Sequence, residues 1–281
     1  MLGRQQKEAA AELAQWWYGV RHGGAGSHAV LLAGPEGWGR STVLDQLPDI
    51  IGRPDAPDLR PVCPVVRING RSLPDGHGPQ ALALRDGLLG GEVRRQAAAL
   101  LCCSRLRGAP RLGTGSLLLS GIAGTMSLVL AGLAAAAKGG LADDSPAGQN
   151  SAAARAARVV AAVSASAPTL VLIDDADHLE LNLAVTVIEN LIDQDDSQVL
   201  VVAAVDLGSD VAAALTARAR YGPTAGRVHR ADADPRMGYQ SRAELAGELS
   251  PHLTAAEAQR LARQTRTFAE IFAAARSQLY P

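Results

Sequence analysis

The chain has 281 residues, of which 47% are hydrophobic and 20% charged, proportions typical of a packed globular protein with one large α/β domain and a small appendage. Its net charge of −1 gives no electrostatic reason to expect nucleic acid or an anionic membrane as a partner. The cysteines Cys63, Cys102 and Cys103 are too few and too unevenly spaced for a disulfide framework or a zinc site. We therefore expect free thiols in a reducing cytoplasm.

The first part of the chain alternates predicted helices and strands. Residues 4–21 have the period of an amphipathic helix and no apolar signal segment precedes them, so we expect a cytoplasmic protein. The short apolar run AVLLAG at 29–34 predicts a buried strand of a parallel sheet. A helix at 41–50, a second strand at 64–70 and a mostly helical stretch at 79–107 follow.

The second part repeats this alternation. Helices are predicted at 153–165, 179–192 and 208–220, and strands at 169–173, 198–205 and 227–231. From Pro235 onward the pattern is helical only, and Thr254 with Glu257 forms a helix-start signal. The alternation predicts an α/β fold with a doubly wound parallel sheet and a small C-terminal helical lid.

An uncharged apolar run at 112–137 is long enough to cross a membrane once. A single crossing would separate the two halves of the predicted site described below, so we expect that the run does not span a membrane. We interpret it as a helical insertion, buried or facing a partner, whose small residues allow close packing. A peripheral membrane contact through this run stays an alternative.

The segment GPEGWGRST at 34–42 fits the phosphate-loop pattern G-x-x-x-x-G-[basic]-[ST] between a strand and a helix. Its glycines let backbone N–H groups turn toward phosphate oxygens, and the next helix adds its positive N-terminal end. A hydroxyl of Ser41 is expected on Mg²⁺, and Thr42 near the α-phosphate. The predicted nucleotide-binding residues of this loop are Gly34, Pro35, Glu36, Gly37, Trp38, Gly39, Arg40, Ser41 and Thr42.

Arg40 stands where this motif usually has lysine. Only Lys7 and Lys138 among the 27 basic residues are lysines, a bias typical of a GC-rich bacterial genome. A guanidinium can neutralise phosphate charge and donate two hydrogen bonds, but it is larger and planar. We therefore predict that Arg40 supports binding of ATP or ADP better than it supports fast hydrolysis.

Acidic residues follow the most strand-like run of the chain, TLVLI at 169–173. Asp174 would lie at the carboxyl end of that strand, where doubly wound sheets bind their ligands. We predict that Asp174 holds the Mg²⁺ shell and that Asp175 polarises the attacking water. A nearby cation would also relieve the repulsion between the two carboxylates. A solvated acidic turn is the alternative interpretation.

Three further residues are candidates for sensing or assembly. Asp206 follows the strand predicted at 198–205 and could act as a γ-phosphate sensor. Arg218 and Arg220 end the next helix, where an arginine finger for a neighbouring subunit could project. The alternative interpretation is that Arg218 and Arg220 are solvated surface residues without a role in assembly.

These motifs resemble those of the AAA+-like ATPases of the STAND group and of the related origin-recognition-type ATPases. In this comparison Gly3 and Arg4 are similar to the entry motif near the adenine, 34–42 to Walker A, and LVLIDDADHLE at 170–180 to Walker B. Residues 232–279 are similar to the helical lid. The chain departs from the family pattern at Arg40, in lacking an early glutamate, and in lacking Gly-Asn-Pro in the lid.

The resemblance implies three regions: an N-terminal helix and adenine-side segment at 1–28, a P-loop core at 29–231 with the insertion at 112–137, and a lid at 232–281. It implies a bacterial Mg-ATP-binding switch with slow or conditional hydrolysis that controls assembly or signalling through protein partners or self-association. The alternatives are a catalytically inactive nucleotide-binding scaffold and a DNA-associated ATPase, the latter disfavoured by the near-zero net charge.

Overall fold

The computed structural model describes residues 3–22, 26–52, 63–97, 146–221, 224–232, 239–249, 253–267, 270–271 and 273–274. The central element is a five-stranded, all-parallel sheet with the strand order β2-β3-β4-β1-β5. The strands are β1 (His28–Ala33), β2 (Val65–Asn69), β3 (Thr169–Asp174), β4 (Val199–Val205) and β5 (Val228–Asp232). The apolar run at 112–137 lies outside the described residues, as do Cys102 and Cys103.

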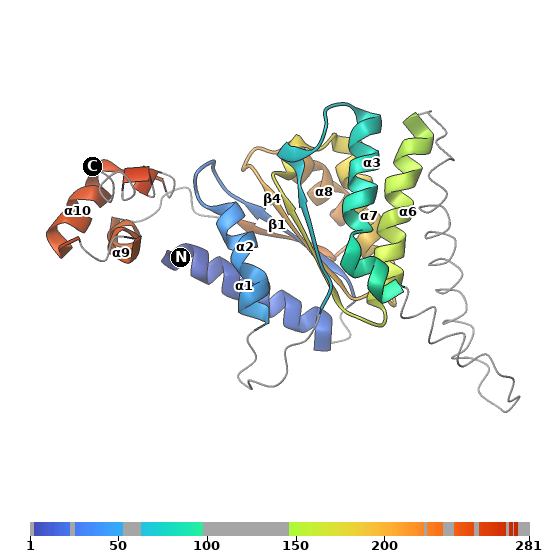
Figure 1. Ribbon diagram of the computed structural model, residues 1–281, viewed down its shortest axis with the longest axis horizontal. Helices are drawn as coiled ribbons and strands as arrows, with labels where there is room; N and C mark the ends of the chain where they lie inside the picture. Colours follow the sequence, from blue (N-terminus) through green and yellow to red (C-terminus); the bar gives the residue numbers. More distant parts are fainter. Residues whose placement is uncertain are drawn as a thin grey trace, which may run out of the picture.

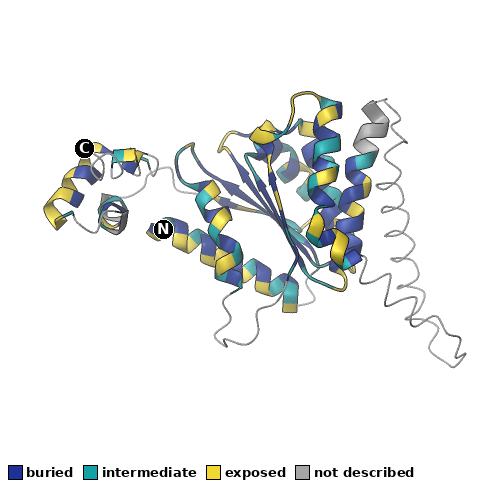
Figure 2. Ribbon diagram, viewed as in Figure 1, coloured by how far each residue is buried: buried dark blue, intermediate teal, exposed yellow. Residues whose placement is uncertain are grey.

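The three central strands are buried on both faces, as expected where helices cover both sides of a parallel sheet. Alternate residues of each strand point to opposite faces and enter two separate cores. In β1, Val30 and Leu32 belong to one core, whereas Ala29, Leu31 and Ala33 belong to the other. Figure 2 shows the continuous burial of these strands between the helical layers.

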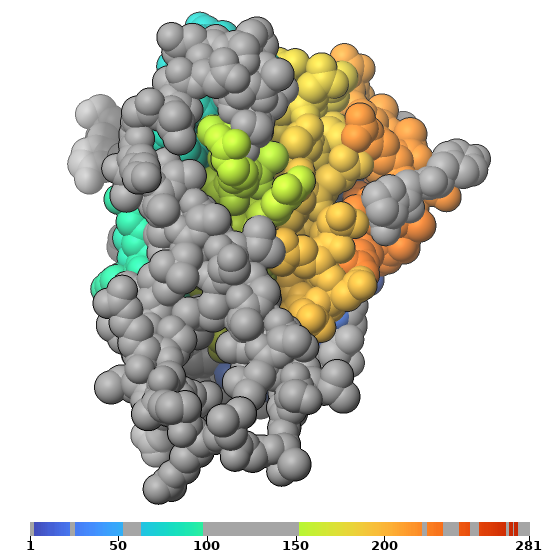
Figure 3. All heavy atoms as spheres, turned by 90° about the vertical axis from the view of Figure 1, so that its right-hand side faces the viewer, coloured from blue at the N-terminus to red at the C-terminus, as the bar shows by residue number. Residues whose placement is uncertain are grey.

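Helices α1 (Arg4–His22) and α2 (Arg40–Ile51) cover one face of the sheet (Figure 1). The opposite face carries α3 (His77–Leu88), α6 (Pro146–Ser164), α7 (Leu181–Ile192) and α8 (Asp210–Tyr221). On the outer surface, α6, α7 and α8 form neighbouring bands (Figure 3). The sheet is therefore the middle layer of three.

The handedness of crossovers accounts for this division. The chain passes from β1 to the far strand β2 in one direction and returns through β3, β4 and β5 in the other. Because such crossovers are right-handed, the outward connection and the returning ones cover opposite faces. β1 and β4 are neighbours, yet the helices that follow them, α2 and α8, lie on opposite faces. A crevice thus opens at the carboxyl ends of β1 and β4, where open α/β sheets bind ligands.

The C-terminal helices α9 (Tyr239–Leu249) and α10 (Ala255–Gln264) pack on each other around a small core of their own. The predicted helix start is confirmed: Thr254 and Glu257 form a reciprocal capping box. Arg242 joins the two helices by donating a hydrogen bond to the carbonyl of Thr265 at 2.9 Å.

The expected α/β class and all five predicted strands are confirmed to within one residue at their ends. The helices predicted at 4–21, 41–50, 153–165, 179–192 and 208–220 are confirmed, although α6 begins earlier than expected, at Pro146. The stretch predicted at 79–107 is divided into α3 and a second helix at 91–97, and residues 98–107 lie outside the described residues. In the described part of the chain, no helix is both long and apolar enough to cross a membrane.

An aromatic cluster fixes α1 to the edge of the sheet. Trp16 stacks on His229 of β5 with 3.9 Å between ring centroids. His229 Nε2 lies 3.0 Å from Nδ1 of His28 on β1. Burial, and secondarily the neighbouring His28, lowers the pKa of His229 below its ordinary 6.5.

This shift predicts a loss of stability at mildly acidic pH. Because protonated His229 is disfavoured in the folded state, its contribution is complete above pH 6.5 and declines as the pH falls toward the lowered pKa. We expect His229→Gln to flatten the pH dependence of the free energy of unfolding between pH 7 and pH 5, measured by urea denaturation. The control His178→Gln, at an exposed position, should retain the wild-type dependence. Identical pH profiles for wild type and His229→Gln would contradict the assignment.

Candidate functional site

The predicted phosphate loop connects β1 to α2 at the crevice. Gly37 and Gly39 have φ values of 76° and 94°, in the left-handed region that glycine adopts without strain. The Gly34 N–H donates to the carbonyl of Val205 at 3.1 Å, and the Trp38 N–H to that of Pro35 at 3.2 Å. The first bond ties the loop to the end of β4, and the second closes a turn within the loop.

The amino end of α2 is open for an anion. Gly39 is the N-cap residue and supplies no side-chain oxygen to the first turn, so the N–H groups of Arg40, Ser41 and Thr42 lack the usual capping partner. Ser41 is exposed, as is Glu36 in the loop. These donors and the helix dipole suit phosphate oxygens.

Gln6 of α1 also holds the loop, a contact that the sequence analysis missed. Its Nε2 donates to the backbone carbonyl of Trp38 at 2.7 Å, and both residues are buried. The available signal was positional: Gln6 lies four residues before Ala10, on the apolar side of α1 that includes Leu13 and Trp17. A polar residue in such a stripe needs a hydrogen-bond partner in the core.

Asp174 ends β3 as predicted, and the Ser41 hydroxyl lies close enough to its carboxylate to favour the ionised form. Burial raises the pKa of Asp174, as do the charges of Asp175 and Asp45. The Ser41 hydroxyl and the hydrogen bond from the Asp175 N–H oppose that rise. The two residues predicted to hold magnesium, far apart in sequence, are therefore neighbours in the fold.

The oxygens of Ser41 and Asp174 could supply part of the coordination shell of Mg²⁺. No group of three or more His, Cys, Asp or Glu side chains suited to a metal occurs among the described residues. Mg²⁺ in nucleotide sites commonly takes only one or two protein oxygens and completes its octahedron with water and phosphates. The pair therefore fits a metal that arrives with a nucleotide.

Asp175 is oriented differently from Asp174. Its backbone has a φ of 48°, and its Oδ2 lies 3.3 Å from Nε of Arg71, which follows β2. The carboxylate is thus engaged by a cation that the sequence analysis did not identify. Gly70 allows this approach, because a Cβ there would lie 2.3 Å from the Asp175 carbonyl oxygen.

Arg40 and Asp206 form an ion pair across the crevice. Nη2 of Arg40 lies 2.6 Å from Oδ1 of Asp206. The Asp206 N–H donates to Oδ2 of Asp177 at 2.5 Å. The structure thus brings together the predicted basic residue of the loop and the predicted sensor, with Asp177 behind them.

Gln80 of α3 holds the turn that follows β3. Its Nε2 donates to the carbonyl of His178 at 3.0 Å, and its Oε1 accepts from the Glu180 N–H at 2.7 Å. One amide side chain thus satisfies two backbone groups of this turn. The turn carries Asp175 and Asp177, so Gln80 fixes their position from the helix layer behind them.

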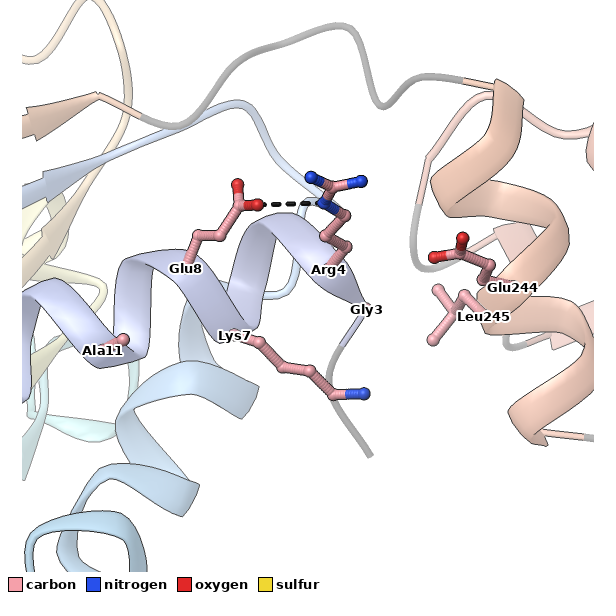
Figure 4. A pocket seen from close by; sticks show the side chains of 7 residues that line it. All are labelled: Gly3, Arg4, Lys7, Glu8, Ala11, Glu244 and Leu245. Carbon is pink, nitrogen blue, oxygen red and sulfur yellow. Dashed lines mark hydrogen bonds and ion pairs between the residues drawn. The ribbon is translucent and has the colours of Figure 1, made fainter.

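Two pockets flank the beginning of α1. One, of about 360 Å³, is lined by Gly3, by Arg4 and Lys7 of α1, and by Glu244 and Leu245 of α9 (Figure 4). The other, of about 380 Å³, reaches the phosphate loop at Trp38 and the end of β5 at Asp232. Glu8 lines both pockets and accepts a 3.0 Å hydrogen bond from Arg4.

Arg218 and Arg220 lie away from these groups. They end α8, which begins beside the crevice and runs back toward the opposite edge of the sheet. Arg218 pairs with Glu189 of α7 at 2.8 Å, and Arg220 is exposed. Their action on a neighbouring subunit stays a prediction.

No protein-family model matches this chain, and no curated protein is similar to it in sequence.

The close approach at Gly70 predicts a large effect of a single methyl group. Gly70→Ala should destabilise the protein by about 1–3 kcal/mol, because the new Cβ must displace backbone next to Asp175. Gly19→Ala on α1 is a matched control, since a Cβ there meets no atom within 4 Å. The control should be stabilising by about 0.5–1 kcal/mol, the helix preference of alanine. Equal free energies of unfolding for the two variants, measured in urea, would refute the steric argument.

Proposed function

We propose that the protein is a Mg-ATP-binding switch module with slow or conditional ATP hydrolysis. The observation that carries the proposal is the approach of the Ser41 hydroxyl, at the amino end of α2, to the carboxylate of Asp174, at the end of β3. It unites a glycine-turned loop, uncapped helix donors and a strand-end carboxylate at the crevice of the sheet. Few ligands other than a metal-bound polyphosphate need all three features.

The roles of the residues follow from their positions. The N–H groups of Gly39 through Thr42 would bind phosphate oxygens, and Ser41 with Asp174 would hold Mg²⁺. The metal would neutralise phosphate charge and orient the β- and γ-phosphates. The pocket at Trp38 and the pocket between α1 and α9 are candidate places for the remainder of the nucleotide.

Two ion pairs favour slow turnover. Asp175, the candidate for polarising water, is engaged by Arg71 at 3.3 Å. Arg40 is engaged by Asp206 at 2.6 Å. Both pairs would have to rearrange before these residues could act on a γ-phosphate, which supports hydrolysis that depends on a further signal or partner.

The proposal includes kinship with AAA+-like ATPases of the STAND group, and a cytoplasmic site of action in a bacterium. It also includes protein partners or self-association as the output of the switch. The contact from Trp38 through Gln6 to α1 supports a mechanical output, because α1 also borders the α9–α10 pair. A loop displaced by nucleotide would move the helix that faces this pair.

A catalytically inactive nucleotide-binding scaffold is the second candidate. The engagement of Asp175 by Arg71 favours it, since no second carboxylate at the end of β3 is then available to a water molecule. Phosphate release measured over hours with excess Mg-ATP separates the candidates. Any release above the buffer rate that Asp174→Asn abolishes supports the slow ATPase.

Binding of ATP is expected to depend on magnesium through Asp174. Asp174→Asn should weaken Mg-ATP binding by about tenfold or more, because even residues that only orient a metal ligand contribute that much. Metal-free ATP binding, measured by calorimetry in EDTA, should change much less. Asp196→Asn, exposed in the turn before β4, is the control and should match wild type. An equal loss with and without metal would exclude the assigned role of Asp174.

A further inference from the structure

The ion pair between Arg40 and Asp206 is unequal in its exposure to solvent. The side chain of Arg40 is 9% exposed, whereas that of Asp206 is 57% exposed. A buried guanidinium requires an anion, because an unpaired charge in that position is strongly destabilising. Another anion can therefore replace the exposed carboxylate of Asp206, whereas the buried guanidinium of Arg40 stays in place and needs an anionic partner.

The guanidinium is also incompletely satisfied. Asp206 contacts Nη2 of Arg40, while Nη1 is buried and has no hydrogen-bond partner among the described residues. A guanidinium matches an oxyanion best when two nitrogens donate in parallel. A phosphate could therefore satisfy Arg40 more fully than the single carboxylate oxygen does.

Backbone contacts keep the carboxylate of Asp206 close to the loop. Its N–H is held by Asp177, and the preceding residue, Val205, accepts a hydrogen bond from the Gly34 N–H at 3.1 Å. Asp206 itself has only acceptor oxygens when ionised, so it cannot donate a hydrogen bond to a γ-phosphate. The sensor role predicted from its position therefore cannot work by direct hydrogen-bond donation to the γ-phosphate.

We propose that Asp206 is an internal anion that competes with nucleotide phosphate for Arg40. This inference rests on the proposed function. Binding then exchanges one anion for another, and the carboxylate of Asp206 is released toward solvent. The released group borders a pocket of about 530 Å³ that Asp177, Leu181 and Asp210 also line, so the exchange is exposed at the surface.

Competition predicts opposite effects of one substitution. Asp206→Asn should raise the affinity for Mg-ATP and for magnesium-bound inorganic triphosphate about tenfold, because the competing charge is gone. The same variant should have a lower melting temperature without ligand, because Arg40 loses its counter-ion. Both affinities are measured by calorimetry, and Asp206→Ala serves as a second variant with the same expected directions.

Asp210→Asn is the matched control, since it removes an equal charge from the lining of the same pocket. Asp210→Asn should change either affinity less than twofold. An effect as large as that of Asp206→Asn would overturn the inference, because it would show that any carboxylate of this pocket weakens binding by general electrostatic repulsion. Wild-type binding that Asp206→Asn and Asp206→Ala leave unchanged or weaken would overturn the inference and leave the proposed function intact. Absence of binding by wild type and all variants would refute the proposed function and the inference with it.

Discussion

Parallel pairing of β3 with β4 and of β4 with β1 is the constraint on which the site depends. These strands run in the same direction and in register, so their carboxyl ends meet at one edge. Each strand then delivers one group there: the phosphate loop after β1, Asp174 at the end of β3, and Asp206 after β4. Burial on both faces fixes the register, because a shift of one residue would move every side chain to the wrong core.

The crevice concentrates charge that the protein must balance. Asp174, Asp175 and Asp206 all lie at this edge, and bringing like charges together costs free energy. Arg40 and Arg71 offset that cost by pairing with two of the three carboxylates. Asp174, which has the Ser41 hydroxyl as its side-chain partner, is left as the carboxylate best suited to a metal ion.

The helical layers do more than cover the sheet. Gln6 on one face holds the carbonyl of Trp38, and Gln80 on the other face holds the turn after Asp174. Each is a buried amide that satisfies backbone groups of a loop, and each ties a loop of the crevice to a helix that packs elsewhere. The positions of these two loops are thereby linked to the packing of α1 and α3. A ligand that moves either loop must act against these helices.

The strands, most of the helices and the glycine turn after β1 could be predicted from local sequence patterns. Continuous apolar runs predicted the strands, since burial on both faces removes polar residues from them. Glycine spacing predicted that the backbone turns sharply after the first strand, and Asp174 was predicted at a strand end because the apolar run stops there. These features are local, so a single stretch of sequence contains them. The expectation that Ser41 and Asp174 share one magnesium site was not local in this sense. It came from a motif in which a phosphate loop and a strand-end carboxylate act on the same metal ion.

Only the tertiary structure decided the partners. Nothing local indicates that β4 lies between β1 and β3, and that order is what brings Asp206 to Arg40. The pairs Gln6–Trp38, Gln80–Glu180 and Arg71–Asp175 likewise join residues from distant segments. Hydrophobic periodicity reports that a side chain is buried but not what it is buried against. The choice of partner depends on how whole layers pack, and for that reason the pairing of Asp206 with Arg40 appears only in the folded protein.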